Sequence, residues 1–313
     1  MEKKILLAII LVIFSIGFIS FFSRQSTDQD TVLLLPGLEE VLEEVNLISF
    51  QSAQPESLLT IKKEPTGWVV IEAGGYPADL NRLSGFLRDL SQLRVLERKT
   101  KKEQNHARLG VSDSLGSPAR LLRIEPGDFT FIIGINSGES GSFVRVKGNP
   151  QVYLTENIFD FELRPNSWID PVIIDVDPEK VQRIDITSSK RPSLSVFREV
   201  DSAEFVLSEQ PANSKLRYET ILDGMARMLV NLRLVGVEKR TELVLKDATE
   251  TRFLLNSGEE LIIKTQRIDG QHFLRVASDE KKRDWLYEIS ESNFQDLNQE
   301  MEGLLLLEGE NNQ

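Results

Sequence analysis

Cysteine is absent from the 313 residues of this chain, and histidine occurs only twice, as His106 and His272. Without cysteine there can be no disulfide bond, no thiolate nucleophile, no cysteine-ligated zinc and no lipid anchor on an N-terminal cysteine. Two histidines are too few for a histidine-rich metal site. We therefore expect no metal and no cofactor, and the sequence offers no catalytic residue.

Positive charge is also scarce. The chain carries 37 Lys and Arg residues against 49 Asp and Glu residues, which gives a formal net charge of -12. Residues 1–31 contribute 0, residues 32–170 contribute -4 and residues 171–313 contribute -8. Nucleic acids are bound through basic surfaces that contact phosphate. Both large stretches are acidic, so we expect no nucleic-acid partner.

A long apolar run, Ile5–Phe22, contains no charged residue. As a helix it would rise roughly 27 Å, close to the hydrocarbon thickness of a bilayer. Lys3 and Lys4 precede it, and the positive-inside bias then places the N-terminus in the cytoplasm and the rest of the chain outside. A cleaved signal peptide is the alternative, but bulky aromatic residues occupy the position where cleavage needs small ones. Residues 1–31 are therefore predicted to be an uncleaved membrane anchor (helix about 5–22) and a linker.

The remaining sequence contains an internal repeat. Hydrophobic residues make up 40% of the chain, which is typical of a folded protein. Three segments recur in the same order, roughly 130–140 residues apart, which is the size of a small domain. The matched pairs are Leu93–Val95 with Leu232–Leu234, Ala119–Leu122 with Thr251–Leu254, and Phe143–Val146 with Phe273–Val276. We predict two domains, residues 32–170 and residues 171–313.

Each predicted domain reads as strands with one central and one terminal helix. The central helices are expected at Ala78–Leu93 and Tyr218–Leu232, where apolar residues recur at three- and four-residue spacing. The terminal helices are expected at Ile158–Leu163 and Asn293–Leu305. The order β-β-β-α-β-β-β-β-α with hairpin spacings predicts an α+β fold with mainly antiparallel sheets.

The predicted strands share short lengths and close spacing. In the first domain they are Leu47–Phe50, Leu58–Lys62, Trp68–Glu72, Leu121–Glu125, Phe129–Ile135, Phe143–Val146 and Val152–Thr155, and in the second Val181–Thr187, Leu194–Arg198, Glu204–Leu207, Arg252–Leu255, Glu260–Thr265, His272–Ala277 and Trp285–Ile289.

Each motif that could bind a ligand or take part in catalysis is better explained by a structural role. The glycine-rich segment Gly134–Gly141 lacks the Lys of a phosphate-binding loop and lies between two predicted strands, which favours a hairpin connection. The acidic run around Glu39–Glu44 is typical of a solvated face. Asp175, Asp177 and Glu179 lack the glycine and terminal Glu of a calcium loop, and Pro178 favours a turn.

The two histidines and a basic cluster complete the candidates. His106 lies in a polar stretch that we expect to be a loop, and His272 opens a predicted strand. No Gly-x-Ser-x-Gly element accompanies either histidine. Arg98, Lys99, Lys101 and Lys102 are interrupted by acidic residues and are predicted to be solvated.

Several short motifs resemble the bacterial family called domain of unknown function 4340. They are Leu35–Leu38, Gly67–Val70, Tyr76–Asp79, Leu109–Val111, Ser117–Ala119, Val152–Leu154 and Ser167–Asp170. The resemblance covers most of residues 32–170 and, more weakly, residues 171–305, as two tandem copies. The second copy lacks an evident Leu-Gly-Val element, so its role can differ.

The resemblance implies an anchor in the bacterial inner membrane, a periplasmic or otherwise extracytoplasmic body, and an accessory role beside ABC-transporter components. It supplies no catalytic residues. The leading hypothesis is thus a non-enzymatic scaffold of an ABC-type transport or envelope complex, with the membrane and transporter proteins as partners. The alternatives are a ligand-binding module for an envelope glycan or lipid, and an envelope hydrolase that uses two facing carboxylates.

Overall fold

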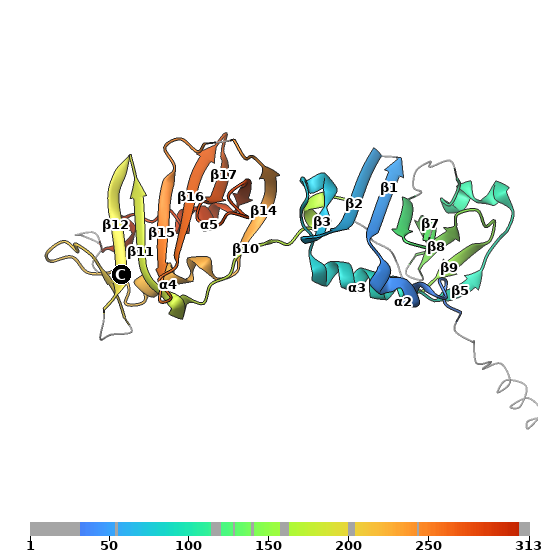
Figure 1. Ribbon diagram of the computed structural model, residues 1–313, viewed down its shortest axis with the longest axis horizontal. Coiled ribbons are helices and arrows are strands. Elements are labelled where there is room, and N and C mark those ends of the chain that lie inside the picture. The colour runs from blue at the N-terminus through green and yellow to red at the C-terminus, as the bar shows by residue number, and fades with distance from the viewer. Residues whose placement is uncertain are drawn as a thin grey trace, which may run out of the picture. The chain divides into compact units, whose positions relative to one another are not determined.

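The computed structural model describes residues 32–53, 56–113, 120–127, 129–138, 141–156, 163–199, 204–242 and 244–306 (Figure 1). Within these ranges the chain forms two mainly antiparallel sheets with few, short helices, a β-rich α+β fold. The expected fold class is therefore confirmed at this level. The chain divides into two compact units: unit 1 is Met1–Leu58 with Ser84–Phe161, and unit 2 is Leu59–Leu83 with Glu162–Gln313.

The first sheet is built from strands in the first half of the chain. They are β1 (Leu47–Ala53), β2 (Glu56–Glu64), β3 (Gly67–Val70), β4 (Tyr76–Pro77), β5 (Val95–Arg98), β6 (Arg120–Glu125), β7 (Phe129–Asn136), β8 (Ser142–Val146) and β9 (Val152–Thr155). Their order across the sheet is β4-β3-β2-β1-β6-β7-β8-β9-β5.

The second sheet is built from strands that follow residue 171. They are β10 (Val172–Ile174), β11 (Val181–Ser188), β12 (Arg191–Arg198), β13 (Phe205–Leu207), β14 (Leu232–Lys239), β15 (Thr249–Leu255), β16 (Glu260–Ile268), β17 (Gln271–Val276) and β18 (Trp285–Ile289). Their order is β10-β14-β18-β17-β16-β15-β11-β12-β13.

Eight strands follow the same order in the two sheets. The series β3-β2-β1-β6-β7-β8-β9-β5 corresponds to β13-β12-β11-β15-β16-β17-β18-β14, and the ninth strand of each sheet lies at an edge. The matched segments Phe143–Val146 and Phe273–Val276 therefore fall on corresponding strands, β8 and β17.

Among the described residues the helices are short, apart from α3 (Leu80–Ser91). The α-helices are α2 (Leu38–Val41), α3 (Leu80–Ser91), α4 (Ile221–Ala226), α5 (Glu291–Asp296) and α6 (Met301–Leu304). The 3-10 helices are η1 (Leu42–Glu44), η2 (Ile71–Ala73), η3 (Glu103–Asn105), η4 (Ala107–Leu109), η5 (Pro165–Ser167), η6 (Pro178–Lys180) and η7 (Arg227–Leu229). The Asp79 carboxylate accepts hydrogen bonds from the backbone N–H groups of Asn81 and Arg82, which satisfies donors at the start of α3.

Strand periodicity places the apolar side chains of each sheet in a core. Along β15, Thr249, Thr251, Phe253 and Leu255 are buried while the residues between them are partly exposed, as expected for a strand with one covered face. In unit 1, Val111, Ile132, Phe143, Val152 and Leu154 form one buried cluster.

The second central helix is shorter than the sequence predicts. Instead of running over Tyr218–Leu232, α4 ends at Ala226 and η7 at Leu229. Asn231 then adopts a left-handed conformation (φ 49), which reverses the chain. Leu232 begins β14, in which Leu232 and Leu234 are buried and Arg233 and Val235 are exposed. The predicted C-terminal end of the helix, at Leu232, is therefore wrong. The apolar residues keep helical spacing up to the first residue of β14, so the spacing did not indicate where the helix ends.

Other expectations have mixed outcomes. The helix predicted at Ala78–Leu93 is confirmed as α3, and the one predicted at Asn293–Leu305 is two short helices, α5 and α6. The predicted helix at Ile158–Leu163 lies almost wholly outside the described residues. Within the described ranges no helix is long and apolar enough to cross a membrane, and the anchor predicted at residues 5–22 lies outside them. The domain bounds 32–170 and 171–313 stay a prediction.

Candidate functional site

His106 lies in a connecting segment, as predicted, and its side chain is buried in unit 1. It joins η3 to η4, and its ring Nε2 lies 3.0 Å from the carbonyl oxygen of Pro150. Its own carbonyl oxygen accepts hydrogen bonds from the backbone N–H groups of Leu109 and Val111. These contacts give His106 a structural role. His272 is the second residue of β17, one position after the start of the strand, and its ring lies against Phe294 with the ring centroids 4.6 Å apart.

The glycine-rich segment connects β7 and β8, which pair in antiparallel fashion, so the predicted hairpin is confirmed. Two of its glycines are required by close packing. A Cβ atom on Gly134 would lie 2.0 Å from the carbonyl oxygen of Leu109, and one on Gly141, where φ is +138, would lie 1.7 Å from that of Thr155. Glycine at these two positions lets the backbone of the segment pack directly against the backbone at Leu109 and Thr155. This packing explains the two glycines, and no bound ligand is needed to account for them.

The candidate carboxylates are solvated or bound to backbone. Glu39, Glu40, Glu43 and Glu44 are exposed. Asp177 caps η6 by accepting a hydrogen bond from the N–H of Glu179, which confirms the turn. Asp175 accepts one from the N–H of Asn231 at 2.8 Å. Within the described residues no group of three His, Asp or Glu side chains could hold a metal ion.

Among the basic candidates, Arg98, Lys99, Lys101 and Lys102 are exposed, as predicted. Sequence reasoning missed a different arginine, Arg145 on β8, which is only 2% exposed. Its guanidinium donates to the carbonyl oxygens of Val111 (2.8 Å) and Asn149 (3.2 Å) and to the Asp113 carboxylate (2.6 Å). Arg145 therefore fixes two loops of unit 1. The sequence pattern that could have indicated Arg145 is the Phe-x-Arg-Val segment, which occurs at Phe143–Val146 and again at Phe273–Val276.

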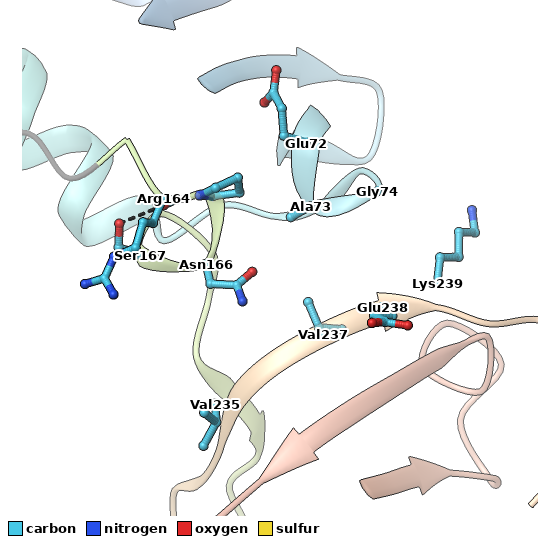
Figure 2. A pocket seen from close by; sticks show the side chains of 11 residues that line it. Glu72, Ala73, Gly74, Arg164, Asn166, Ser167, Val235, Val237, Glu238 and Lys239 are labelled. Carbon is cyan, nitrogen blue, oxygen red and sulfur yellow. Dashed lines mark hydrogen bonds between the residues drawn. The ribbon is translucent and has the colours of Figure 1, made fainter. Parts of the chain in front are cut away.

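A pocket in unit 2 has a volume of about 690 Å³. It is an open hollow where η2 and η5 approach β14 (Figure 2). Its lining residues are mixed in charge and contain no aromatic ring. They are Glu72, Ala73, Gly74, Arg164, Pro165, Asn166, Ser167, Val235, Val237, Glu238 and Lys239.

The charged side chains of this pocket do not converge. Figure 2 shows Glu72, Arg164 and Lys239 extending in different directions, with the Glu72 carboxylate directed away from Glu238. The Glu72 carboxylate already accepts a hydrogen bond from the backbone N–H of Thr60 at 2.6 Å. A carboxylate pair needs both groups directed at one bond. Glu72 and Glu238 do not form such a pair.

A buried aromatic cluster supports one wall of the pocket. The Tyr76 ring makes edge-to-face contacts with Trp285 (5.0 Å between centroids) and with Tyr287 (6.1 Å), and the Trp285 ring packs beside Gly74. Burial raises the pKa of Tyr76 to about 12, and burial also raises the pKa of Tyr287. Both phenols are therefore neutral at physiological pH, and the cluster acts as a rigid apolar support.

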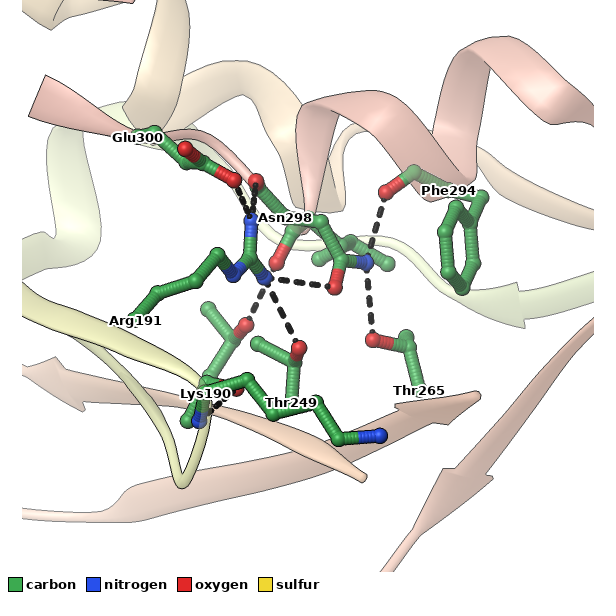
Figure 3. A network of polar contacts seen from close by, with 10 residues as sticks. Lys190, Arg191, Thr249, Thr265, Phe294, Asn298 and Glu300 are labelled. Carbon is green, nitrogen blue, oxygen red and sulfur yellow. Dashed lines mark hydrogen bonds and ion pairs between the residues drawn. The ribbon is translucent and has the colours of Figure 1, made fainter. Parts of the chain in front are cut away.

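A polar network joins β12 and β15 to the C-terminal helices of unit 2 (Figure 3). The Arg191 guanidinium donates to the carbonyl and side-chain oxygens of Asn298 (2.9 and 3.2 Å) and to the Thr249 hydroxyl (2.9 Å), and it pairs with Glu300. The Asn298 amide in turn donates to the Thr265 hydroxyl (2.8 Å) and to the Phe294 carbonyl oxygen (2.7 Å). The network fastens the segment between α5 and α6 onto the covered face of the sheet.

Comparison with known proteins identifies one family. The model of the family described as Domain of unknown function (DUF4340) matches residues 68–251, which is more than half of the 313 residues. No curated protein and no solved structure matches. The two tandem copies expected from the sequence stay a prediction, but the expected family is confirmed: the chain belongs to the family Domain of unknown function (DUF4340).

Proposed function

We propose that this chain is a non-enzymatic accessory protein of an ABC-type transport or envelope complex, anchored in the bacterial inner membrane with its body outside the cytoplasm. Membership in the DUF4340 family and the charge-free run at Ile5–Phe22 support this role. The structural observation that supports it is the charged, partly exposed face of the second sheet in unit 2.

One face of this sheet is covered and the other is open. Ile184, Phe253 and Ile263 are buried on the covered face, where α4 contacts β11 and the Asn298 network contacts β15. On the open face, charged side chains of β11, β15 and β16 are between 26% and 47% exposed. They are Arg183, Asp185, Glu250, Arg252, Glu260 and Lys264, and we call them the charged sheet face.

The charged sheet face alternates in sign. Arg183 pairs with Asp185 at 2.9 Å, and Arg252 pairs with Glu250 and Glu260 at 3.2 Å each. Lys264 lies 3.5 Å from Glu250. Pairs this exposed add little to folding stability. A partner with the complementary pattern would gain specificity from them, because mismatched charges are penalised strongly at an interface.

Copurification tests the partner claim. The tagged full-length chain would be purified from membranes in mild detergent, and bound proteins identified by mass spectrometry. We expect subunits of an ABC-type transporter in stoichiometric amounts. Recovery of the chain alone would count against the proposal.

The absence of cysteine makes the topology directly testable. Ser193→Cys would place one thiol on exposed β12 in an otherwise thiol-free chain. We expect a membrane-impermeant maleimide to label this variant in intact spheroplasts. Wild type is the matched control, because it contains no thiol and should stay unlabelled. Labelling only after lysis would place the body in the cytoplasm and contradict the proposed orientation.

We also infer that the two sheets are tandem copies of one family domain. The support is the shared eight-strand order together with the matched segments on corresponding strands. An experimental structure with a different strand order in the two sheets would contradict this inference.

The alternative functions have less support. A glycan-binding site usually offers aromatic rings for stacking, and the pocket at η2, η5 and β14 is lined by none. A two-carboxylate hydrolase needs facing acids, and Glu72 and Glu238 do not face one another there.

A further inference from the structure

A second cavity in unit 2 has a distinct chemical character. It has a volume of about 320 Å³ and lies where the middle of β16 and the end of β17 meet the segments that follow β14 and precede β18. Its lining residues are Thr241, Val244, Leu245, Lys264, Arg275, Ala277, Arg283 and Asp284. We call it the Arg283 pocket. Three of its residues are cationic and one is a carboxylate, in a chain whose net charge is -12.

Two of the cations face each other across neighbouring strands. Lys264 on β16 lies directly opposite Arg275 on β17 in the antiparallel register. Like charges in directly opposed positions destabilise a sheet unless an anion lies near both. Glu250 approaches Lys264 at 3.5 Å from the neighbouring strand. Burial lowers the pKa of the Arg275 guanidinium, and the nearby Asp284 carboxylate opposes this shift.

Arg283 adds a third cation to this pocket. Among the described residues no ion pair to Arg283 is found, and its side chain is exposed at the pocket rim. A guanidinium presents several N–H donors in one plane, which matches the paired oxygens of a carboxylate or phosphate group. The rim is therefore suited to an incoming anion.

The corresponding site of the first sheet lacks this character. Arg145 on β8 corresponds to Arg275 on β17. Arg145 donates to the carbonyl oxygen of Val111, in the segment after β5. Arg275 donates to the carbonyl oxygen of Arg240, in the segment after β14. Opposite Arg145 the first sheet places the apolar Ile132, and Asp113 binds the arginine directly. At this pair of positions the second sheet has opposed cations and the first sheet does not.

The other wall of the pocket is apolar. Val244 is 75% exposed, and Leu245 and Ala277 complete the wall. The cavity thus combines an apolar wall with three cations, a lining that suits a ligand with both an anionic group and a hydrocarbon part.

We propose that the Arg283 pocket binds a small amphiphilic anion, in which a phosphate or carboxylate group contacts Lys264, Arg275 and Arg283 and a short aliphatic chain packs on Val244 and Leu245. The site goes beyond the proposed accessory role. It shares Lys264 with the charged sheet face, but ligand binding here does not require a protein partner.

Calorimetric titration of the full-length chain in uncharged detergent tests the proposal, with hexyl phosphate, hexanoate and inorganic phosphate as probes. We expect hexyl phosphate to bind more tightly than inorganic phosphate. Arg283→Gln should weaken hexyl phosphate binding about tenfold through loss of one charged contact. Val244→Ser should weaken hexyl phosphate a few-fold and leave inorganic phosphate unchanged.

Arg267→Gln is the matched control, because Arg267 is exposed on the same strand as Lys264 but does not line the pocket. It should bind hexyl phosphate as wild type does. Equal loss in the Arg283 and Arg267 variants, equal affinity for hexyl and inorganic phosphate, or no binding by folded wild type would each overturn the proposal. Short-chain phosphatidate identifies the source: tighter binding than hexyl phosphate indicates a lipid headgroup, and weaker binding a soluble ester.

Discussion

At the scale of single residues, position 134 requires glycine because the backbone at Leu109, distant in the sequence, packs against it. A Cβ atom there would collide with the Leu109 carbonyl oxygen. We expect Gly134→Ala to lower the free energy of unfolding by about 3 kcal/mol, because backbone has to move to relieve the overlap. Urea denaturation measures this.

Gly85→Ala is the control in the same unit. Gly85 lies within α3, and an added Cβ would meet only the Arg88 guanidinium at 3.9 Å. Alanine there should raise the stability by about 0.5–1 kcal/mol. A neutral Gly134→Ala variant would contradict the packing described for the β7–β8 connection.

Arg145 is a second residue whose contacts define a prediction. Arg145→Met should cost about 3 kcal/mol, because the carbonyl oxygens of Val111 and Asn149 lose their donor. Asp113→Asn should cost less than about 1 kcal/mol, since the Asp113 side chain is 66% exposed. Chemical denaturation of both variants separates the two contributions. Equal losses would show that the ion pair, rather than the carbonyl contacts, is the main stabilising interaction.

The buried tyrosines predict a pH dependence. A tyrosine in an unfolded chain ionises near pH 10, whereas burial raises the pKa of Tyr76 to about 12. Between these values the folded state holds more protons than the unfolded state. The contribution of Tyr76 to the free energy of unfolding is therefore complete below pH 10. It is lost as the pH rises towards 12, by up to about 1.4 kcal/mol per pH unit.

Urea denaturation between pH 9 and pH 11.5 checks this dependence. Tyr76→Phe should flatten the decline in stability above pH 10. An identical slope for the variant and wild type would contradict the raised pKa.

At the scale of elements, the Arg191–Asn298 network ties the C-terminal helices to the sheet. Asn298→Ala removes contacts to Arg191, Thr265 and the Phe294 carbonyl oxygen. We expect a loss of about 2–3 kcal/mol and faster amide hydrogen exchange in α5 and α6. Hydrogen exchange with mass spectrometry measures the local effect.

Glu300→Gln provides the comparison, because the Glu300 side chain is 51% exposed and its loss leaves Asn298 in place. It should cost less than about 1 kcal/mol. Protection of α5 and α6 that is unchanged in Asn298→Ala would contradict the role assigned to the network.

Strand alternation made most of the sheet predictable from the sequence. Val181–Thr187, Phe143–Val146 and Trp285–Ile289 were predicted and lie within or coincide with observed strands. The end of α4 was missed, because the left-handed Asn231 carries no strong sequence signal and the apolar spacing runs on through it. The polar sites were missed for a different reason. The Arg145 and Arg191 contacts join residues that are up to 109 positions apart, and local pattern does not encode such pairings.

At the scale of the whole molecule, the central claim is that the charged sheet face of unit 2 binds a membrane partner. Arg252 is paired with two carboxylates on this face, and Arg252→Glu would reverse the sign at that position. Arg267→Glu makes the same charge change at an exposed position outside the face. Both variants should be checked for folding by circular dichroism before use.

The most direct test compares the amount of ABC-type transporter subunits that copurify with wild type, Arg252→Glu and Arg267→Glu from membranes. We predict a loss of about fivefold or more for Arg252→Glu and no loss for Arg267→Glu, because like charges across an interface are strongly penalised. Equal recovery with both folded variants, or no transporter subunit with wild type, would contradict the claim.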